Sequence, residues 1–159
     1  MADRILVLIR HAKSDWGVPA SDRDRPLAAR GRRQAPATGR WLTEHAVLPD
    51  LAVVSVAARA RQTWDLVAAE LPTEPPVEVS EAAYTFAGTD LLRLLAGIDE
   101  QAHTIALVGH NPAMEELART LTGQWVAMPT SALAVLELPG GSLRPGAARI
   151  QYAGRPGDH

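Results

Sequence analysis

Arg4-Ile5-Leu6-Val7-Leu8-Ile9-Arg10-His11 is the stretch of sequence that decides the expected fold. Residues 5–9 are all apolar and have polar neighbours, which is typical of a strand buried on both faces of a parallel sheet. An arginine and a histidine follow the apolar run directly. Because ligands of open α/β sheets bind outside the carboxyl ends of the strands, we expect Arg10 and His11 at a site of chemistry.

Two further predicted strands end in the same kind of residue. Residues 104–108 predict a buried strand that His110 follows, and residues 51–55 predict another, with Arg59 shortly after it. A single histidine after a strand is more often an ordinary loop residue than a catalyst. Two histidines and two arginines at three strand ends, however, form a constellation that packing alone does not require.

Apolar patterns divide the chain into alternating strands and helices. The predicted strands are residues 4–9, 51–55, 77–79, 104–108, 131–138 and 147–152, and the predicted helices are residues 28–46, 59–71, 90–98 and 112–121. This alternation implies an α/β fold, a three-layer α/β/α sandwich whose central sheet is mostly parallel with an antiparallel hairpin at one edge. We expect a single domain over residues 1–153 and a frayed C-terminal tail over residues 154–159.

Composition narrows the class of protein. The chain has 159 residues and a net charge of −2, so nucleic acid is not expected as a partner. No apolar run approaches the roughly 20 residues that cross a bilayer, and the N-terminus lacks the pattern of a signal peptide. We therefore expect a cytoplasmic protein that does not bind membranes. Cysteine is absent, which excludes disulfides, cysteine–zinc sites and thiol nucleophiles.

The residues at the three strand ends predict a pocket for a dianion. Arg10 and Arg59 offer guanidinium forks that match phosphate oxygens. Asn111 is expected to cap a helix that has Pro112 in its first position, and this would add the positive end of a helix dipole. A neutral imidazole in such a pocket can attack phosphorus and form a phosphohistidine intermediate, while the second imidazole stabilises the developing charge.

Other phosphate chemistries fit the sequence less well. No glycine-rich loop with Lys and Ser or Thr is present, which argues against a P-loop nucleotidase. Asp22-Arg23-Asp24 has the spacing of an aspartate-nucleophile phosphatase but lies in a loop, not after a buried strand. The histidine positions match no local metal-ligand pattern, so neither a metal nor another cofactor is expected.

Four segments in this order resemble the histidine phosphatase superfamily, also called the phosphoglycerate mutase-like superfamily. The segments are Leu8-Ile9-Arg10-His11-Ala12, Arg25-Pro26-Leu27 with Gly31, Ser55-Val56-Ala57-Ala58-Arg59-Ala60-Arg61-Gln62-Thr63, and Val108-Gly109-His110-Asn111-Pro112. The short chain and Arg10-His11-Ala12-Lys13-Ser14 are most similar to the SixA-like phosphohistidine phosphatases. The resemblance covers roughly residues 4–138 and implies a phosphoglycerate mutase-like fold.

The resemblance also implies roles for individual residues. His11 would be the nucleophile, with Arg10, Arg59 and His110 around the phosphoryl group, and Arg25 would lie near the pocket rim. An alternative for Arg25 is a surface salt bridge with Asp22 or Asp24. Ser14 and Asn111 are further candidates for substrate contacts. For a general acid, Glu81 at a strand end is the best candidate, and Asp15 is a poorer one.

These observations predict a metal-independent phosphohydrolase. The favoured substrate is a phosphohistidine on a protein, such as a histidine phosphotransfer domain, because its imidazole can leave already protonated. The alternatives are a phosphatase for small phosphomonoesters and a non-catalytic phosphate-binding regulatory module. A mutase is disfavoured, since the short chain leaves little to enclose and reorient an intermediate.

Overall fold

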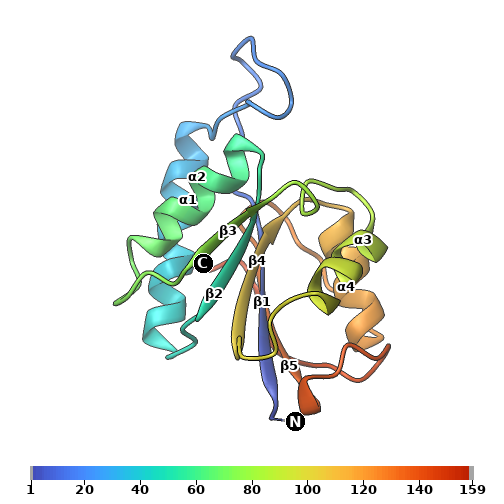
Figure 1. Ribbon diagram of the computed structural model, residues 1–159. Helices are drawn as coiled ribbons and strands as arrows, with labels where there is room; N and C mark the ends of the chain where they lie inside the picture. The colour runs from blue at the N-terminus through green and yellow to red at the C-terminus, as the bar shows by residue number, and fades with distance from the viewer. Residues whose placement is uncertain (1, 158–159) are drawn as a thin grey trace.

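The computed structural model describes residues 2–157, whose strands and helices follow one another as in Figure 1. The strands are β1 (Arg4–Arg10), β2 (Leu51–Ser55), β3 (Val77–Ser80), β4 (Thr104–Gly109), β5 (Leu133–Leu138) and β6 (Arg149–Gly154). The helices are α1 (Ala29–Glu44), α2 (Ala58–Ala68), α3 (Gly88–Ala96) and α4 (Ala113–Thr122), with a 3₁₀ turn η1 (Pro139–Gly141) after β5. Within this part of the chain, no helix has the length and apolar character needed to span a bilayer.

The six strands form one mixed sheet in the order β3-β2-β4-β1-β5-β6. The pairs β3–β2, β2–β4 and β4–β1 are parallel, whereas β5 is antiparallel to both β1 and β6. The predicted α/β sandwich with an antiparallel edge is therefore confirmed. Its strand order makes β2, β4 and β1 neighbours, so the three strand ends that carry the candidate residues meet at one edge.

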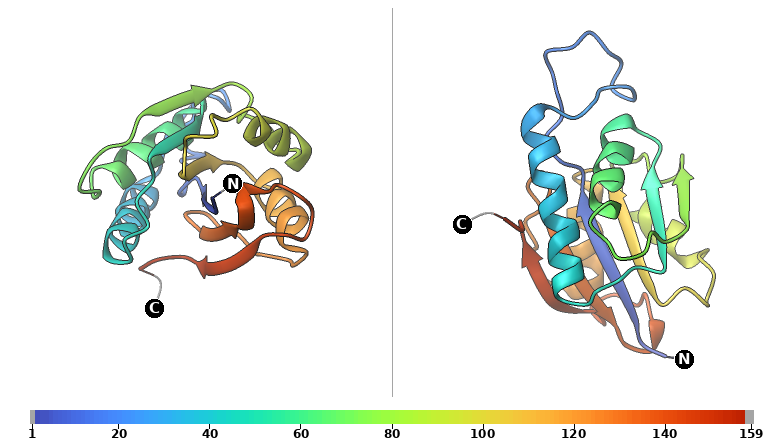
Figure 2. Two further views of the ribbon diagram at one scale, coloured as in Figure 1. Left: turned by 60° about the horizontal axis from the view of Figure 1, so that its bottom comes forward. Right: turned by 90° about the vertical axis from the view of Figure 1, so that its left-hand side faces the viewer.

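Helices cover both faces of the sheet. The pair α1 and α2 lies on one face, and the pair α3 and α4 lies on the other (Figures 1 and 2). Alternate residues of β1 serve the two cores: Leu6 and Leu8 pack toward α3 and α4, and Val7 and Ile9 pack toward α1 and α2. All four are fully buried, which stabilises the fold by about 1.5–3 kcal/mol for each side chain.

The loop between β1 and α1 projects beyond the sheet at its carboxyl edge (Figure 2, right). Its two ends are joined by an isolated bridge between Ser14 and Leu27. Gly31, in the first turn of α1, sits so close to the loop that an added Cβ would lie 2.2 Å from the carbonyl oxygen of Lys13. No other residue fits this contact, which anchors α1 directly against the chain that leaves β1.

The last strand reaches further along the chain than the sequence indicates. The expected frayed tail was to begin at residue 154, but β6 continues to Gly154, where it pairs with Leu133. Pro156 is buried, and a Cβ on Gly157 would lie 3.0 Å from Ala37 of α1. Packing of a short proline-containing segment on a helix leaves no periodic signal in the sequence. The last part of the tail, residues 158–159, lies outside the described residues.

Candidate active site

A cavity of about 270 Å³ opens at the carboxyl edge of the sheet, above the ends of β1, β2 and β4. Its lining residues are Arg10, His11, Lys13, Ser14, Trp16, Asp22, Arg25, Arg59, Phe86, His110, Asn111 and Thr130. It contains seven of the eight site residues expected from the sequence, with Glu81 as the exception. The strand ends thus bring together Arg10 and His110, which are 100 positions apart in the chain.

His11 follows β1 and is held in one tautomer by its own backbone. Its Nδ1 lies 2.9 Å from the carbonyl oxygen of Ala12, which can only accept a hydrogen bond, so Nδ1 carries the proton. The lone pair of Nε2 faces Arg59, whose Nε donates to it at 3.4 Å. Burial, with the charges of Arg59 and Arg10, lowers the pKa of His11 from 6.5 to about 3. His11 is therefore a neutral imidazole whose Nε2 can act as a nucleophile.

His110 follows β4, and its ring lies 5.1 Å from that of His11 between centroids. Its Nε2 is 2.7 Å from Oγ of Ser55, which also accepts from the amide of Ala57. The Ser55 hydroxyl has no other acceptor among the described residues, so its proton points to Nε2 and the ring proton of His110 lies on Nδ1. That Nδ1 is buried and has no protein partner. Burial and Arg59 lower the pKa of His110 to about 4, which leaves a neutral donor.

Three arginines of the cavity, named here the inner arginines, are Arg10, Arg25 and Arg59. Arg59 lies in the first turn of α2 and is 2% exposed. Its Nη1 donates to the carbonyl oxygen of Asp22 at 2.6 Å, and its Nη2 donates to the carboxylate of the same residue at 3.2 Å. Two of its groups are thus held by the loop, while Nε points to His11.

Arg25 combines the two roles that the sequence left open. It lines the cavity and is 7% exposed, and it also pairs with Asp22, with 2.8 Å between Nη1 and Oδ1. Its Nε donates to Oγ of Ser14, and the ring of Trp16 lies 3.5 Å from its Cζ. Ser14 therefore holds an arginine in place, which gives this predicted substrate-contacting residue a clear structural task.

Asp22 is the functional residue that the sequence reasoning did not assign to the pocket. Its carboxylate accepts hydrogen bonds from Tyr84, Arg25 and Arg59, and these hold its pKa well below the usual range, with the bond from Tyr84 having the largest effect. It is therefore an acceptor with a fixed negative charge. Its position three residues before Arg25 was a usable signal, because a carboxylate and a guanidinium at that spacing in one loop often pair.

Arg10 and Asn111 meet at the carbonyl oxygen of Met128. Nη1 of Arg10 donates to it at 3.1 Å, and the side-chain amide of Asn111 donates at 2.7 Å. The prediction that Asn111 caps the helix with Pro112 in its first position was wrong. Helix α4 starts at Ala113 with Pro112 as its cap residue and has no side-chain capping bond. The Asn111 amide binds the segment before β5 instead, through the carbonyl oxygen of Met128.

The rest of the segment around Arg59 fastens the loop to α2. Oγ1 of Thr63 accepts from the amide of Ala12 at 2.9 Å, and the side chain of Gln62 accepts from the amide of Leu27 at 2.8 Å. These two bonds hold both ends of the loop. They explain why glutamine and threonine follow the arginine at this spacing, and why the peptide next to His11 keeps its orientation.

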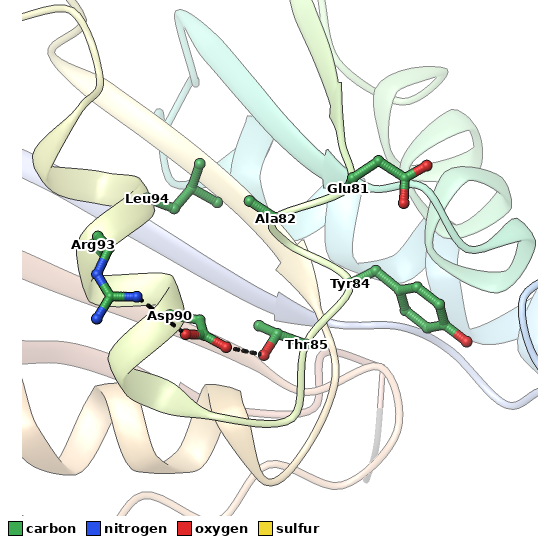
Figure 3. Close-up of a pocket in the computed structure, with 7 residues that line it drawn as sticks. All are labelled: Glu81, Ala82, Tyr84, Thr85, Asp90, Arg93 and Leu94. Carbon is green, nitrogen blue, oxygen red and sulfur yellow. Dashed lines mark hydrogen bonds and ion pairs between the residues drawn. The ribbon is translucent and has the colours of Figure 1, made fainter.

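The structure does not bring Glu81 into the cavity of His11. Glu81 follows β3 at the edge of the sheet and pairs with Arg23 on the surface. It lines a different hollow of about 360 Å³ under α3, together with Tyr84, Asp90 and other residues (Figure 3). In Figure 3 the carboxylate of Glu81 extends away from Asp90 and from helix α3. A general-acid role for Glu81 stays a prediction that this geometry does not support.

The cavity can bind a phosphoryl group and present it to Nε2 of His11. The inner arginines and Nδ1 of His110 supply donors for its oxygens, and the burial of Arg25, Arg59 and His110 strengthens their electrostatic effect. Within residues 2–157, no group of three or more histidine, aspartate or glutamate side chains is arranged to hold a metal ion. The arrangement suits transfer of a phosphoryl group to nitrogen.

Comparison with known proteins agrees with this arrangement. A protein of Mycobacterium tuberculosis (strain ATCC 25618 / H37Rv), itself uncharacterised, is 32% identical over 155 residues, which cover 89% of this chain and 96% of that protein. A solved structure of a candidate phosphohistidine phosphatase SixA from Nakamurella multipartitia is 28% identical, with a TM-score of 0.83 and 99% coverage of both chains. The protein histidine phosphatase SixA solved with tungstate has the same fold, with a TM-score of 0.81, 24% identity and coverage of 96% of this chain and 97% of that one.

A sequence profile of the histidine phosphatase superfamily (branch 1) matches residues 6–83, which include Arg10, His11 and Arg59. The structural likeness extends over the rest of the chain and includes β4 and His110, which follows it. The fold is thus phosphoglycerate mutase-like, with a mixed six-stranded sheet flanked by helices. On this evidence, the chain belongs to branch 1 of the histidine phosphatase superfamily.

Proposed function

We propose that the protein hydrolyses phosphohistidine on a partner protein, by way of a phosphoryl intermediate on His11. Family membership supports a phosphatase, and the structural likeness to SixA proteins supports phosphohistidine as the substrate. The proposed partner is a histidine phosphotransfer domain or a similar phosphoprotein. For the protein itself, the sequence predicts a location in the cytoplasm. The proposal requires no metal ion, since arginines and an imidazole supply the charge and the donors.

The observation that carries the substrate assignment is the nature of the carboxylate beside His11. Among residues 2–157, Asp22 is the carboxylate that lines the cavity, and its pKa is held far below neutrality by Tyr84 and the arginines. A permanently ionised carboxylate cannot protonate an alcohol leaving group. A phosphohistidine needs no such proton from the enzyme, because its imidazole leaves with the proton on its other nitrogen.

The proposed reaction has two steps at phosphorus. Nε2 of His11 attacks the phosphoryl group, the P–N bond of the substrate breaks, and the substrate imidazole leaves as a neutral ring. The Nδ1 proton of His11 stays bonded to the carbonyl of Ala12 and stabilises the positive charge that the ring acquires. Water then attacks the phosphorus, its proton goes to the released phosphate or to solvent, and the P–N electron pair returns to Nε2.

The test is a hydrolysis assay with a metal chelator present. A phosphohistidine peptide and a panel of small phosphomonoesters are compared for the wild type, His11→Ala and His103→Ala. We expect fast release from phosphohistidine, slow release from the esters, and loss of activity by at least about a thousandfold in His11→Ala. His103 is exposed and lies at the opposite edge of the sheet, before β4, so His103→Ala is the matched control and keeps activity.

The other outcomes separate the competing functions. Fast ester hydrolysis that depends on His11 would establish a small-molecule phosphatase in place of the proposed one. Binding of inorganic phosphate with no turnover on either substrate class would favour a non-catalytic regulatory module. Activity that disappears with the chelator and returns with a divalent metal would contradict the metal-independent mechanism.

A further inference from the structure

A second hollow of about 310 Å³ lies beside α1 and is lined mainly by arginine. Its lining residues are Arg30, Arg33, Gln34, Ala37, Arg155, Pro156 and Gly157. The arginines of this hollow, Arg30, Arg33 and Arg155, are named here the outer arginines. They come from the first two turns of α1 and from the residue after β6, segments that lie side by side in Figure 2.

The outer arginines bring three positive charges into one hollow, with no carboxylate among its lining residues. Six other arginines form ion pairs with aspartate or glutamate, namely Arg23, Arg25, Arg40, Arg59, Arg93 and Arg149. Across residues 2–157, the structure has no ion pair to any of the outer arginines. In addition, Nε of Arg155 is buried and lacks a hydrogen-bond partner. A buried donor without a partner is costly, so this hollow is prepared for an acceptor that comes from outside.

This hollow is close to the cavity of His11. The side chain of Gln34, which lines the hollow, accepts a hydrogen bond from the amide of Lys13, which lines the cavity. On the other side, Arg155 is near enough to Arg10 to influence it: burial lowers the pKa of Arg10, Glu115 partly opposes this, and the charge of Arg155 lowers it further. Both sites therefore lie at the carboxyl edge of the sheet, with Lys13 between them.

We propose that the outer arginines form a second anion-binding site for carboxylate side chains of the same partner protein whose phosphohistidine occupies the cavity. The proposal rests on the proposed function for the identity of that partner. Guanidinium groups pair well with carboxylates, and three of them around one open hollow suit an acidic surface segment better than one small ion. The occupied site would raise affinity for acidic phosphoproteins and leave the chemical step unchanged.

The first test compares two phosphohistidine peptides of equal length, one with Asp and Glu beside the phosphohistidine and one with Asn and Gln. The variant Arg30→Gln/Arg33→Gln changes two exposed side chains of α1, so it should fold normally. We expect KM for the acidic peptide to rise about fivefold and kcat to stay constant, since exposed ion pairs contribute modestly. KM for the neutral peptide should not change, and added salt should reduce the difference between the peptides.

The control variant Arg32→Gln/Arg119→Gln removes the same charge from exposed arginines outside the hollow, one of them on the same helix. It should affect the two peptides equally. If the control variant raises KM for the acidic peptide as much as the test variant does, general surface charge explains the preference and the proposal is wrong. If the test variant lowers kcat for both peptides, the outer arginines serve the chemistry and not the partner.

A second test does not depend on turnover. Side-chain NMR signals of the arginine Nε–H groups are followed while an unphosphorylated glutamate-rich peptide is added to the wild type and to Arg155→Gln. We expect the signals of Arg30, Arg33 and Arg155 to shift in the wild type, and weaker binding in Arg155→Gln. A glutamine-rich peptide should cause no shift. Absence of shifts with the acidic peptide would overturn the second site even if phosphohistidine hydrolysis is fully established.

Discussion

The inner and outer arginines lie at the same edge of the sheet, yet they are held in opposite ways. Two of the inner arginines are enclosed: Arg59 is 2% exposed and Arg25 is 7% exposed, and both bind Asp22. The third, Arg10, is half-buried and donates to the carbonyl oxygen of Met128. The outer group lines an open hollow and has no carboxylate partner among the described residues. Burying a guanidinium is costly unless it is paired, whereas the exposed guanidiniums of Arg30 and Arg33 keep their water.

This difference shows how one fold separates chemistry from recognition. The inner arginines must have fixed positions before the substrate arrives, because a preorganised donor needs no reorganisation during the reaction. Asp22 fixes the positions of Arg25 and Arg59, and its negative charge offsets part of their positive charge. The outer arginines keep their full charge for a partner and can adapt their positions. Substitutions should therefore change kcat at the inner group and KM at the outer group.

The sharpest way to test the comparison is the same conservative change in both groups. Arg59→Lys should lower kcat/KM on phosphohistidine by about 100- to 1,000-fold, because lysine cannot bridge the Asp22 carboxylate, its carbonyl oxygen and Nε2 of His11. Arg33→Lys keeps the charge and should stay within about twofold, as expected for a surface charge. Steady-state kinetics with circular dichroism as a folding check measures both. If Arg59→Lys lowers kcat/KM by less than fivefold, the inner and outer arginines would not differ in their role in catalysis.

The inner group also differs in its two neutral histidines. Their folded pKa values, about 3 for His11 and about 4 for His110, lie below the unfolded value of 6.5, so the unfolded chain binds more protons between these values. The free energy of unfolding should therefore fall as pH drops from 6.5 toward 4, by about 2 kcal/mol per histidine at pH 5. Urea unfolding at neutral and acidic pH measures this fall. The substitution His11→Asn should remove the part of this fall that His11 causes. The substitution His45→Asn, at an exposed histidine, should leave the fall unchanged.

Removing the charge of Asp22 should make the inner arginines resemble the outer ones. Asp22→Asn should lower the stability of folding by about 1–2 kcal/mol, less than for a fully buried pair because the Asp22 side chain is 44% exposed. Inorganic phosphate should then bind more tightly than in the wild type and restore most of the lost stability. Calorimetry with and without phosphate tests this. Equal phosphate affinity in the two proteins would mean that Asp22 does not compete with anions.

The smallest expected effect lies behind the inner group, at Ser55. Ser55→Ala removes the bond that keeps the ring proton of His110 on Nδ1, and kcat should fall by about tenfold, as is common for residues that orient a functional imidazole. KM for the acidic peptide should stay the same, since the outer arginines are unaffected. Ser55→Thr keeps the hydroxyl and should recover most of the activity. If Ser55→Thr is as slow as Ser55→Ala, packing and not the hydrogen bond is responsible.

The residues at strand ends could be predicted from the sequence, and so could Arg25 and Ser14 of the loop, but Asp22 could not be assigned to the cavity. His11, His110 and Arg59 follow buried apolar runs, whose topology fixes where they meet. Asp22 lies in a polar loop without periodicity, and only the loop bridges and its arginine partners bring it to the cavity. Its neighbourhood was visible in the sequence as a salt bridge to Arg25, but its contact with Arg59 depends on tertiary structure.

Glu81 is a strand-end residue that the sequence wrongly suggests for the cavity. It follows a strand, as the histidines do, but β3 is the outermost parallel strand, and β2 and β4 separate it from β1. At about 4.8 Å per strand, the ends of β3 and β1 are roughly 14 Å apart. A strand-end rule cannot tell a central strand from an edge strand, because strand order is set by the packing of helices. Arg23 then holds the Glu81 carboxylate on the surface.

The contact between Nδ1 of His11 and the carbonyl oxygen of Ala12 has a further consequence for the phosphoenzyme. Because Nδ1 is committed to the backbone, only Nε2 is open to phosphorus, and the modified protein should carry one positional isomer of phosphohistidine. That isomer has the phosphoryl group on the nitrogen remote from the main chain. The carbonyl oxygen of Ala12 therefore determines which nitrogen of His11 is phosphorylated.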